Sequence, residues 1–324
     1  MYLIFDTETT GLPKRWDAPI TDTDNWPRCV QIAWQLHDEL GNLVEHQDYL
    51  VRPDGFNIPY ESEQVHGIST GLAEQQGETL EVVFERFNEA LHKATFVVGQ
   101  NVGFDVNIMG CEFHRMSVKN SLAELPVLDT CTEHTAQLCQ IPGGRGGKFK
   151  LPTLTELHQY LFGEPFAEAH NATADVEATT RCFLELVRRK QFSTKELDVQ
   201  PDYFQRFSEA NPKEIQLIGL KHLNLKKASA EIAKALQNIQ VEVISEAEIH
   251  ENAASIAEAP FAHLHNHSQF SVLQSTINIK DLVKAAAKDG MTAVALTDRA
   301  NMMGAFHFVK EITAHNKKVS EENI

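Results

Sequence analysis

The segment 1–8 limits the fold most tightly, because it is predicted to be a buried strand that carries two carboxylates on one face. Its sequence, MYLIFDTE, is apolar up to Phe5 and then places Asp6 and Glu8 at alternate positions. Side chains two residues apart on a strand point the same way, so these carboxylates share a face and repel one another. Divalent cations with oxygen ligands are the natural counter-charge for such a pair. A solvated strand edge is the ordinary alternative.

The following segments predict an α/β domain. Apolar alternation predicts a hairpin of two strands joined by Leu-Gly-Asn, after which helical and strand-like patterns alternate. The expected elements are strands over 29–37 and 43–51, a helix over 78–93, a strand over 95–98, a helix over 104–116, a strand ending at 129, and helices over 130–139, 153–162 and 173–190. Three strands followed by this alternation indicate a mixed sheet with flanking helices.

Two later motifs supply further acidic and imidazole side chains. Asp105 follows an apolar strand at the start of a helix, and α/β sheets place ligands at the carboxyl ends of strands. His170 and Asp175 would lie about 140° apart within a single helix and could not converge. If Asn171 caps the helix, however, Asp175 lies in its second turn and His170 precedes it on a loop. Taken alone, Asp105 is better explained by an acidic residue that complements a helix dipole. A surface histidine beside a first-turn carboxylate is the commoner explanation of a pair such as His170 and Asp175.

Taken together, the motifs resemble a known nuclease family. FDTETTG at 5–11, N-x-x-F-D at 101–105 and H-x-x-x-x-D at 170–175 follow the order of the three exonuclease motifs of the DEDDh family, the type of the proofreading epsilon subunit. The resemblance covers residues 1–190. It implies a ribonuclease-H-like fold and 3′→5′ cleavage that depends on two divalent cations, Mg²⁺ or Mn²⁺.

The same resemblance implies roles for individual residues. Asp6 would bridge the two metal ions, and Glu8 and Asp175 would complete their ligand shells. Asp105 would act largely through water. His170 would be the general base, since an imidazole with a free pKa near ~6.5 accepts a proton at physiological pH. Substrate contacts are implied for Thr9, His66, Asn101 and Phe104, with core packing as the alternative for the phenylalanine.

Two loops in this region leave alternatives open. The segment 13–27 contains Trp16 and Trp26, which either stack on bases or fold the loop back onto the domain, and we expect the second. The glycine-rich segment 140–150 is expected to be a plain flexible loop. Contacts from its basic residues to DNA phosphates are the alternative.

Residues 191–259 are polar and are predicted to form a helical linker, with helices near 212–222 and 228–239. Within the first of these, QLIGL at 216–220 resembles the pentapeptide that bacterial replication proteins present to the sliding clamp. It lacks the usual terminal aromatic residue. We expect an amphipathic packing face at this position, with clamp binding as the alternative.

Residues 260–324 contain a different pattern. His265 and His267 lie on one face of a predicted strand, and imidazoles at that spacing are potential metal ligands. With Asp298 in ALTDRANMMG, the segment resembles the opening of the PHP domain of bacterial DNA polymerase III alpha subunits. Arg299 stands where that family usually has histidine. We therefore expect a truncated (β/α) scaffold fragment rather than a working phosphoesterase.

The overall charge limits how the chain meets nucleic acid. A net charge of −16 argues against a protein that coats nucleic acid through a basic face. It is compatible with an enzyme that grips one strand end, because metal ions then supply the positive charge. The sequence has no run of eighteen apolar residues, no signal-peptide pattern and no C-x-x-C pair, so we expect no membrane partner and a location in the bacterial cytoplasm.

The leading hypothesis is a proofreading DNA exonuclease at the N-terminal end of a bacterial replicative polymerase. Its substrate would be a DNA 3′ end, its product a nucleoside 5′-monophosphate, and its partners the rest of the polymerase and the replisome. An RNA-trimming 3′→5′ exoribonuclease is the second hypothesis. The third is a non-enzymatic replisome scaffold whose acidic motifs hold structural ions.

Overall fold

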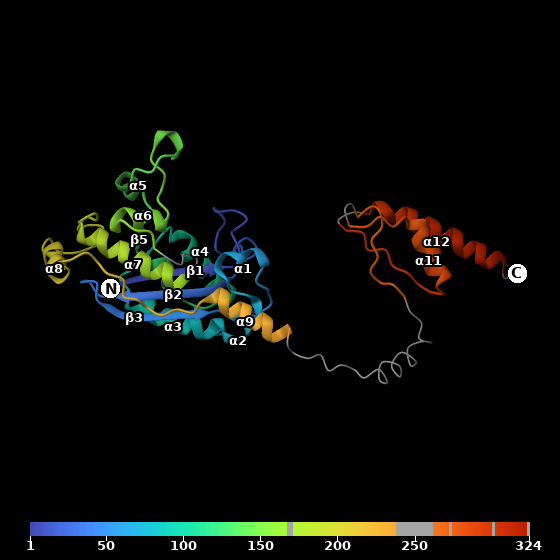
Figure 1. Cartoon of the computed structure of the whole chain (residues 1–324), viewed down its shortest axis with the longest axis horizontal. Helices are drawn as coiled ribbons and strands as arrows, with labels where there is room; N and C mark the ends of the chain where they lie inside the picture. The colour runs from blue at the N-terminus through green and yellow to red at the C-terminus, as the bar shows by residue number, and fades with distance from the viewer. Residues whose placement is uncertain (167–170, 238–261, 272–273, 300–301, 323–324) are drawn as a thin grey trace. The chain divides into compact units, whose positions relative to one another are not determined.

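The chain forms two compact units, Met1–Ile239 and Gln240–Ile324, which we call the first and second units. The structure is a computed structural model, and it describes residues 1–166, 171–237, 262–271, 274–299 and 302–322 (Figure 1). Among these residues, no helix combines the length and the apolar character needed to cross a membrane. All five cysteines are free thiols.

A five-stranded sheet in the order β3-β2-β1-β4-β5 forms the centre of the first unit. Its strands are β1 (Tyr2–Thr9), β2 (Cys29–His37), β3 (Leu43–Leu50), β4 (Phe96–Gly99) and β5 (Val127–Asp129). The first three strands pair in antiparallel fashion, whereas β4 is parallel to β1 and β5 is parallel to β4. The mixed sheet predicted from the sequence is thereby confirmed, with the carboxylate-bearing strand at its centre.

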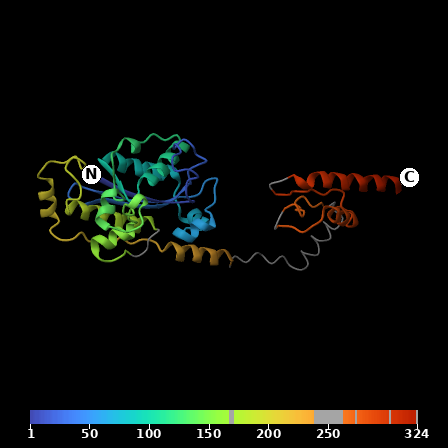
Figure 2. The same ribbon diagram turned by 90° about the horizontal axis from the view of Figure 1, so that it is seen from above.

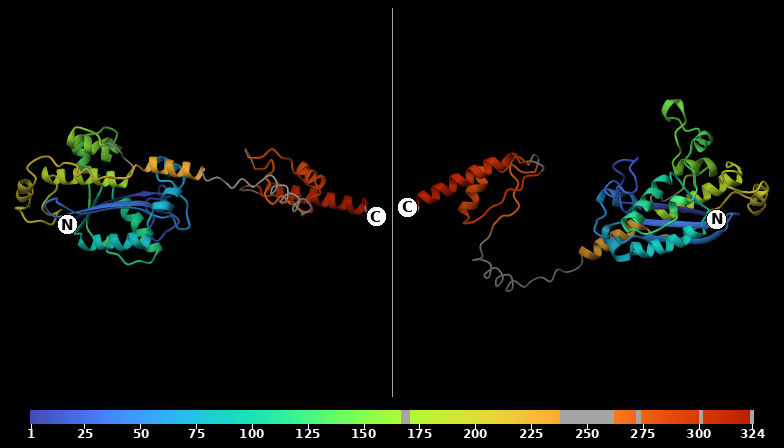
Figure 3. Two further views of the ribbon diagram at one scale, coloured as in Figure 1. Left: turned by 60° about the horizontal axis from the view of Figure 1, so that its bottom comes forward. Right: turned by 180° about the vertical axis from the view of Figure 1, so that it is seen from behind.

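Helices cover both faces of this sheet (Figures 2 and 3). The helices α3 (Leu80–Lys93) and α4 (Gly103–Arg115) pack on one face, and α7 (Ala172–Arg188) packs on the other. The remaining helices of the first unit are α1 (Tyr60–His66), α2 (Thr70–Gln76), α5 (Glu133–Cys139), α6 (Leu154–Phe162), α8 (Tyr203–Ala210), α9 (Leu225–Gln237), and the short 3-10 turns η1 (Leu122–Glu124) and η2 (Arg145–Gly147).

The alternation of side chains along β1 decides which layer each residue meets. Phe5 packs into the core beneath α3 and α4, and Ile4 packs into the core beneath α7. Because successive strand residues point to opposite faces, Asp6 and Glu8 lie on the α7 side with Ile4, and Thr7 lies on the α4 side with Phe5.

The helix predicted over 212–222 is wrong, because this segment is extended. Its backbone groups bond to side chains of α7 instead of to one another. Glu177 accepts hydrogen bonds from the N–H groups of Gly219 and Leu220, at 2.5 and 3.3 Å. Arg181 Nε donates to the carbonyl oxygen of Ile215 at 2.9 Å. The segment therefore crosses α7 as a strap that leads to α9.

The second unit contains two described helices, α11 (Ile279–Lys288) and α12 (Met303–Glu322). Asn278 caps α11, with its side chain accepting the N–H of Lys280. The strands predicted on either side of α11 meet at one parallel bridge, between His263 and Val294.

Candidate active site

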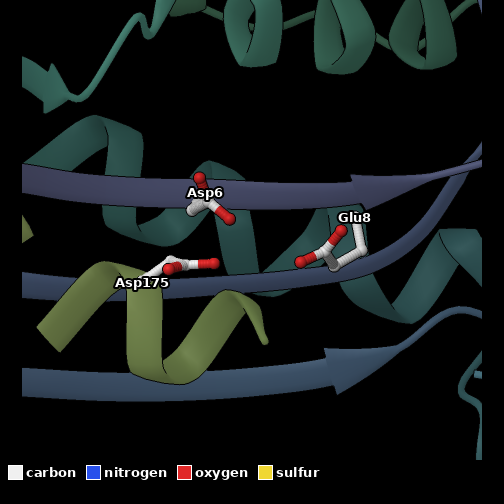
Figure 4. Close-up of side chains that lie close together, drawn as sticks. All are labelled: Asp6, Glu8 and Asp175. Carbon is white, nitrogen blue, oxygen red and sulfur yellow. The ribbon is translucent and has the colours of Figure 1, made fainter. Parts of the chain in front are cut away.

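Three of the predicted carboxylates converge between β1 and α7 (Figure 4). Asp6, Glu8 and Asp175 each offer one oxygen, and these three oxygens lie within 4.8 Å of one another. All three residues are half-buried. Asp6 and Glu8 share this position because they are two residues apart on β1, and Asp175 faces them from the first turn of α7.

The start of α7 brings Asp175 to the sheet. Asn171 caps this helix, its side chain accepting the N–H groups of Thr173 and Ala174, which confirms the predicted cap. The N–H of Ala172 donates to Oε1 of Gln31 on β2 at 3.3 Å, so the first turn is tied to the sheet. His170, the predicted general base, precedes the cap and lies outside the described residues.

The close approach of these groups changes how readily they ionise. Burial raises the pKa of Asp6 well above its usual range, and the charges of Asp105, Asp175 and Glu8 add to the effect. Burial, followed by repulsion from Asp175 and Asp105, raises the pKa of Glu8 to about 8. Two or more carboxylates kept close together in a partly dry site need a bound cation or a proton to offset their repulsion.

Asp105 reaches the same place from the α4 layer. It is 4% exposed, and its Oδ1 accepts two hydrogen bonds from Thr7, from the N–H at 2.9 Å and from Oγ1 at 2.6 Å. Burial raises the pKa of Asp105 to about 7, although the bonds from Thr7 act in the opposite direction. Asp105 is therefore beside the three-carboxylate group, close enough to raise the pKa of Asp6 and Glu8, but it is not one of the three converging groups.

The loop ahead of α4 is held by a carboxylate that the sequence did not single out. Asp129, at the end of β5, accepts the N–H groups of Asn101 and Val102 at 2.8 and 3.1 Å. Asn101 has φ of 57°, in the left-handed region that asparagine tolerates better than most residues. Gly99 lies so close to Val102 that a Cβ on it would come within 2.6 Å of the valine side chain. Together these contacts fix where α4, and hence Asp105, begins.

Comparison with known proteins decides the family. The sequence profile of the family described as exonuclease matches residues 3–183, which is more than half of the chain. The chain belongs to the exonuclease family. The first unit thus carries a 3′→5′ exonuclease domain of the DEDD type with a ribonuclease-H-like fold, and we call it the exonuclease unit. A second profile, that of the PHP domain, matches residues 263–320.

The second unit is similar to short parts of much longer proteins. The chain is 43% identical over 63 residues to the DNA polymerase III subunit alpha of Treponema pallidum, and 43% identical over 58 residues to that of Aquifex aeolicus. These matches cover 19% and 18% of this chain, and 5% of each relative. Among solved structures, E. coli exonuclease I in complex with a dT13 oligonucleotide is similar at 21% identity and a TM-score of 0.47, covering 61% of this chain and 42% of that chain.

The residues predicted to contact substrate lie in the exonuclease unit in different settings. Thr9 is buried and its Oγ1 donates to the carbonyl oxygen of Gly11 at 2.7 Å. His66 is buried at the end of α1, where its Nδ1 accepts the N–H of Ile68. Phe104 is half-buried against the core beneath α3 and α4. Asn101 is exposed on the loop held by Asp129.

Three structural supports of the exonuclease site escaped the sequence reasoning, namely Thr7, Gln31 and Asp129. Thr7 had a signal, since it lies between Asp6 and Glu8 in a predicted strand. Asp129 also had a signal, because it lies at the end of a predicted strand, much as Asp105 comes shortly after another. Gln31 had none, because a polar residue in a strand does not indicate on its own that it will accept a hydrogen bond from a helix start.

The two tryptophans of segment 13–27 in the exonuclease unit differ in how far they are buried. Trp26 is 3% exposed and donates from Nε1 to the carbonyl oxygen of Pro19 at 3.1 Å, so the predicted folding of the loop onto the domain is confirmed for this residue. Trp16 is 60% exposed, and its ring meets the domain at Phe104, with the ring centroids 5.8 Å apart.

The imidazole and carboxylate candidates of the second unit are arranged differently. The rings of His265 and His267 lie with their centroids 4.7 Å apart. Asp298 accepts hydrogen bonds from the N–H and Oγ of Ser268 and from Oγ of Ser271, at 2.6, 2.7 and 2.9 Å. Burial would raise the pKa of Asp298, but these hydrogen bonds outweigh it and leave the pKa lowered.

Proposed function

We propose that the exonuclease unit is a metal-dependent DNA exonuclease that removes nucleotides from a 3′ end and releases nucleoside 5′-monophosphates. The observation that carries the proposal is the convergence of Asp6, Glu8 and Asp175, with oxygens within 4.8 Å of one another. The raised pKa values of Asp6 and Glu8 indicate a site in which negative charge is incompletely offset by the protein itself. Such a site suits a reaction that needs bound cations.

The donor set of this site fits Mg²⁺ or Mn²⁺. It consists of carboxylate oxygens, which hard divalent cations prefer, and Asp6, Glu8 and Asp175 would hold two such ions. When bound, a pair of ions neutralises charge on the scissile phosphate and lowers the pKa of the attacking water. Asp105 adds a fourth negative charge beside them, and Thr7 fixes its orientation.

His170 is the proposed general base. It immediately precedes the capping residue Asn171, and an imidazole is deprotonated over much of the physiological pH range. It would take the proton of the attacking water, and the 3′-oxygen of the preceding nucleotide would leave. Since these groups act on the backbone, we expect little dependence on base sequence.

The second unit favours DNA as the substrate and replication as the setting. Its relatives are alpha subunits of a DNA polymerase. We propose that the exonuclease unit proofreads for a bacterial replicative polymerase and that residues 260–324 are part of a PHP domain. RNA trimming is the competing activity, and the test below separates the two.

The decisive experiment measures nucleotide release from a 3′-mismatched primer–template, a matched primer–template and an RNA strand of the same sequence. We expect Mg²⁺-dependent release of nucleoside 5′-monophosphates, fastest from the mismatched DNA and abolished by EDTA. The Asp6→Asn variant, purified in the same way, controls for a contaminating nuclease. Release from RNA alone would replace the DNA assignment, and no metal-dependent release from either polymer would overturn the proposed function.

A further inference from the structure

An exposed tryptophan, Trp16, packs against the half-buried ring of Phe104. The rings of Trp16 and Phe104 lie with their centroids 5.8 Å apart and their planes inclined by 50°. Phe104 directly precedes Asp105, which is bonded to Thr7 between the two carboxylates of β1. Trp16 is the more open member of the pair, at 60% exposure. Because the two rings are tilted, Phe104 does not cover the indole as a flat stack would.

Trp16 is exposed on a segment that is otherwise tied down. This segment is the dark-blue loop that follows β1 (Figure 1). Asn25 accepts the N–H of Arg15 at 2.8 Å and donates to its carbonyl oxygen at 2.9 Å, which fixes the residue next to Trp16. Arg115 of α4 donates to the carbonyl oxygen of Trp26 at 2.6 Å, which anchors the far end of the loop. The loop that carries Trp16 is therefore anchored, and it holds the exposed indole beside Phe104.

Two basic residues directly precede this indole, and the acidic Asp17 follows it. Lys14 and Arg15 precede Trp16 and are exposed, in a chain with a net charge of −16. Arg15 forms a long ion pair with Asp22, at 4.0 Å between exposed groups. Positive charges interleaved with an exposed aromatic ring are the combination that binds single strands, since the charges meet phosphates and the ring meets bases.

We propose that Trp16, supported by the ring of Phe104, forms a stacking platform for one of the last two bases of the strand held in the carboxylate site, with Lys14 and Arg15 next to its phosphates. The inference rests on the proposed nuclease function and adds a substrate-positioning residue to it. Every nucleobase has a π-face, so the platform binds all four bases and adds affinity without strict sequence preference.

Intrinsic fluorescence tests the contact directly. The chain has three tryptophans, and Trp26 and Trp34 are 3% and 0% exposed, so a change caused by a ligand is expected to come from Trp16. A phosphorothioate oligonucleotide added with Ca²⁺ in place of Mg²⁺ binds without being cut, and its binding is followed separately by anisotropy of a 5′ label. We expect saturable quenching that disappears in Trp16→Phe while the oligonucleotide still binds. Quenching that persists in Trp16→Phe, or binding to the wild type without quenching, would overturn the platform.

Kinetics provide a second, independent measurement. Base–aromatic stacking changes affinity by roughly 5- to 150-fold when the ring is removed, so Trp16→Ala should raise KM by a factor in this range and Trp16→Phe should restore most of it. Tyr160→Ala on α6 is the matched control, because it also removes a partly exposed ring, at 44% exposure. Unchanged melting temperatures exclude misfolding of the variants.

Substrates that lack one base complete the test. An abasic residue at one of the last two positions should weaken binding to the wild type as much as Trp16→Ala does, and combining the two should cause no further loss. Additive losses at both positions would overturn the platform. A failure of the proposed function is distinguishable, because the wild type would then release no nucleotide, whereas a failure of the platform alone leaves release intact and KM unaffected by Trp16→Ala.

Discussion

The exonuclease unit and the second unit both contain clusters of residue types that bind metals in other proteins. The pKa values of the carboxylates in the two clusters are shifted in opposite directions. Asp6 and Glu8 face Asp175 across a short distance, and burial and mutual repulsion raise their pKa values. Asp298 is surrounded by hydroxyl and amide donors, and its pKa is lowered. A carboxylate that the protein already satisfies has little need of a cation, whereas a cluster that repels itself gains stability when one binds.

The two units also differ in whether the carboxylate charges stabilise or destabilise the local fold. In the second unit the charge of Asp298 helps to hold a local turn, because Ser268 and Ser271 both bond to it. In the exonuclease unit the charges of Asp6 and Glu8 oppose the packing of α7 on β1 until something neutralises them. Residues retained at a cost to the folded state are characteristic of functional sites.

The largest expected effect is on turnover, and it comes from replacing one carboxylate by an amide in each unit. Asp6→Asn should reduce turnover by at least ~10³-fold, because a lost ligand removes several kcal/mol of charge stabilisation at the phosphate. The matched change Asp298→Asn should leave turnover on the same oligonucleotide within twofold. Steady-state release of nucleoside 5′-monophosphates measures both. A comparable loss in both variants would break the comparison.

Removal of the proposed base should have a large effect of another kind. His170→Ala should lower turnover by ~10²–10⁴, the usual contribution of a positioned general base. Binding of Mg²⁺ should persist, because the carboxylates remain. The wild-type rate should rise with pH as an imidazole loses its proton, and the variant should lack this step. Near-normal turnover in His170→Ala, from a pH–rate profile of both proteins, would remove His170 from the mechanism.

The parts of the site that follow from local periodicity were predictable from the sequence. The spacing of Asp6 and Glu8 places both on one face of a strand whatever surrounds it, and Asn171 signals the helix start that carries Asp175. The fold class was equally accessible, because three strands followed by alternating helices and strands have few arrangements. These inferences need only the geometry of one element at a time.

The rest depended on contacts between elements that are distant in sequence. Asp105 is held by Thr7, which is 98 residues away in the sequence. Asp105 belongs to α4, on the face of the sheet opposite α7, and no local sequence pattern specifies on which face a helix packs. The segment 212–222 has a helical pattern but is extended, because Glu177 and Arg181 of α7 bond to its backbone. Tertiary hydrogen bonds there outweigh a weak local propensity.

A third prediction concerns stability in the absence of metal. Glu8 and Asp105 have folded-state pKa values of about 8 and about 7, above the ~4 of unfolded carboxyls. A raised folded pKa stabilises the folded state fully at low pH, and this contribution is lost as the pH rises through the folded pKa. With EDTA present, the free energy of unfolding should therefore decrease as the pH rises from about 4 to about 8.

Denaturant unfolding followed by tryptophan fluorescence measures this in the exonuclease unit alone, since Trp16, Trp26 and Trp34 all belong to it. Mg²⁺ should flatten the decrease, because a bound cation replaces the protons. Glu8→Gln should also flatten it, and Asp298→Asn in the second unit should not. An identical pH dependence for the wild type and Glu8→Gln would show that the pKa of Glu8 is not raised.

The smallest expected effect tests how far the exonuclease unit extends beyond the residues that match the family. Ser229 of α9 is buried and its Oγ bonds twice to the loop after α1, accepting the N–H of Ser69 at 3.0 Å and donating to the carbonyl oxygen of Gly67 at 2.7 Å. Gly67 has φ of +80°, and a Cβ on it would come within 2.5 Å of Lys226. The loop between the predicted substrate contact His66 and the buried Ile68 is therefore shaped against α9.

Ser229→Ala should cost ~1–3 kcal/mol of stability through the two lost hydrogen bonds, and each kcal/mol corresponds to about 2–4 °C in melting temperature for a unit of this size. Because the loop carries His66, KM for an oligonucleotide should also rise, by about two- to fivefold, with kcat nearly unchanged. Ser208→Ala on α8 is the matched control, since its hydroxyl donates to the carbonyl oxygen of Phe204 within its own helix, and it should leave KM unchanged. A lower melting temperature with an unaltered KM would mean that α9 stabilises the unit without shaping its substrate loop. A raised KM in Ser229→Ala alone would place the functional limit of the exonuclease unit at α9, well past residue 183.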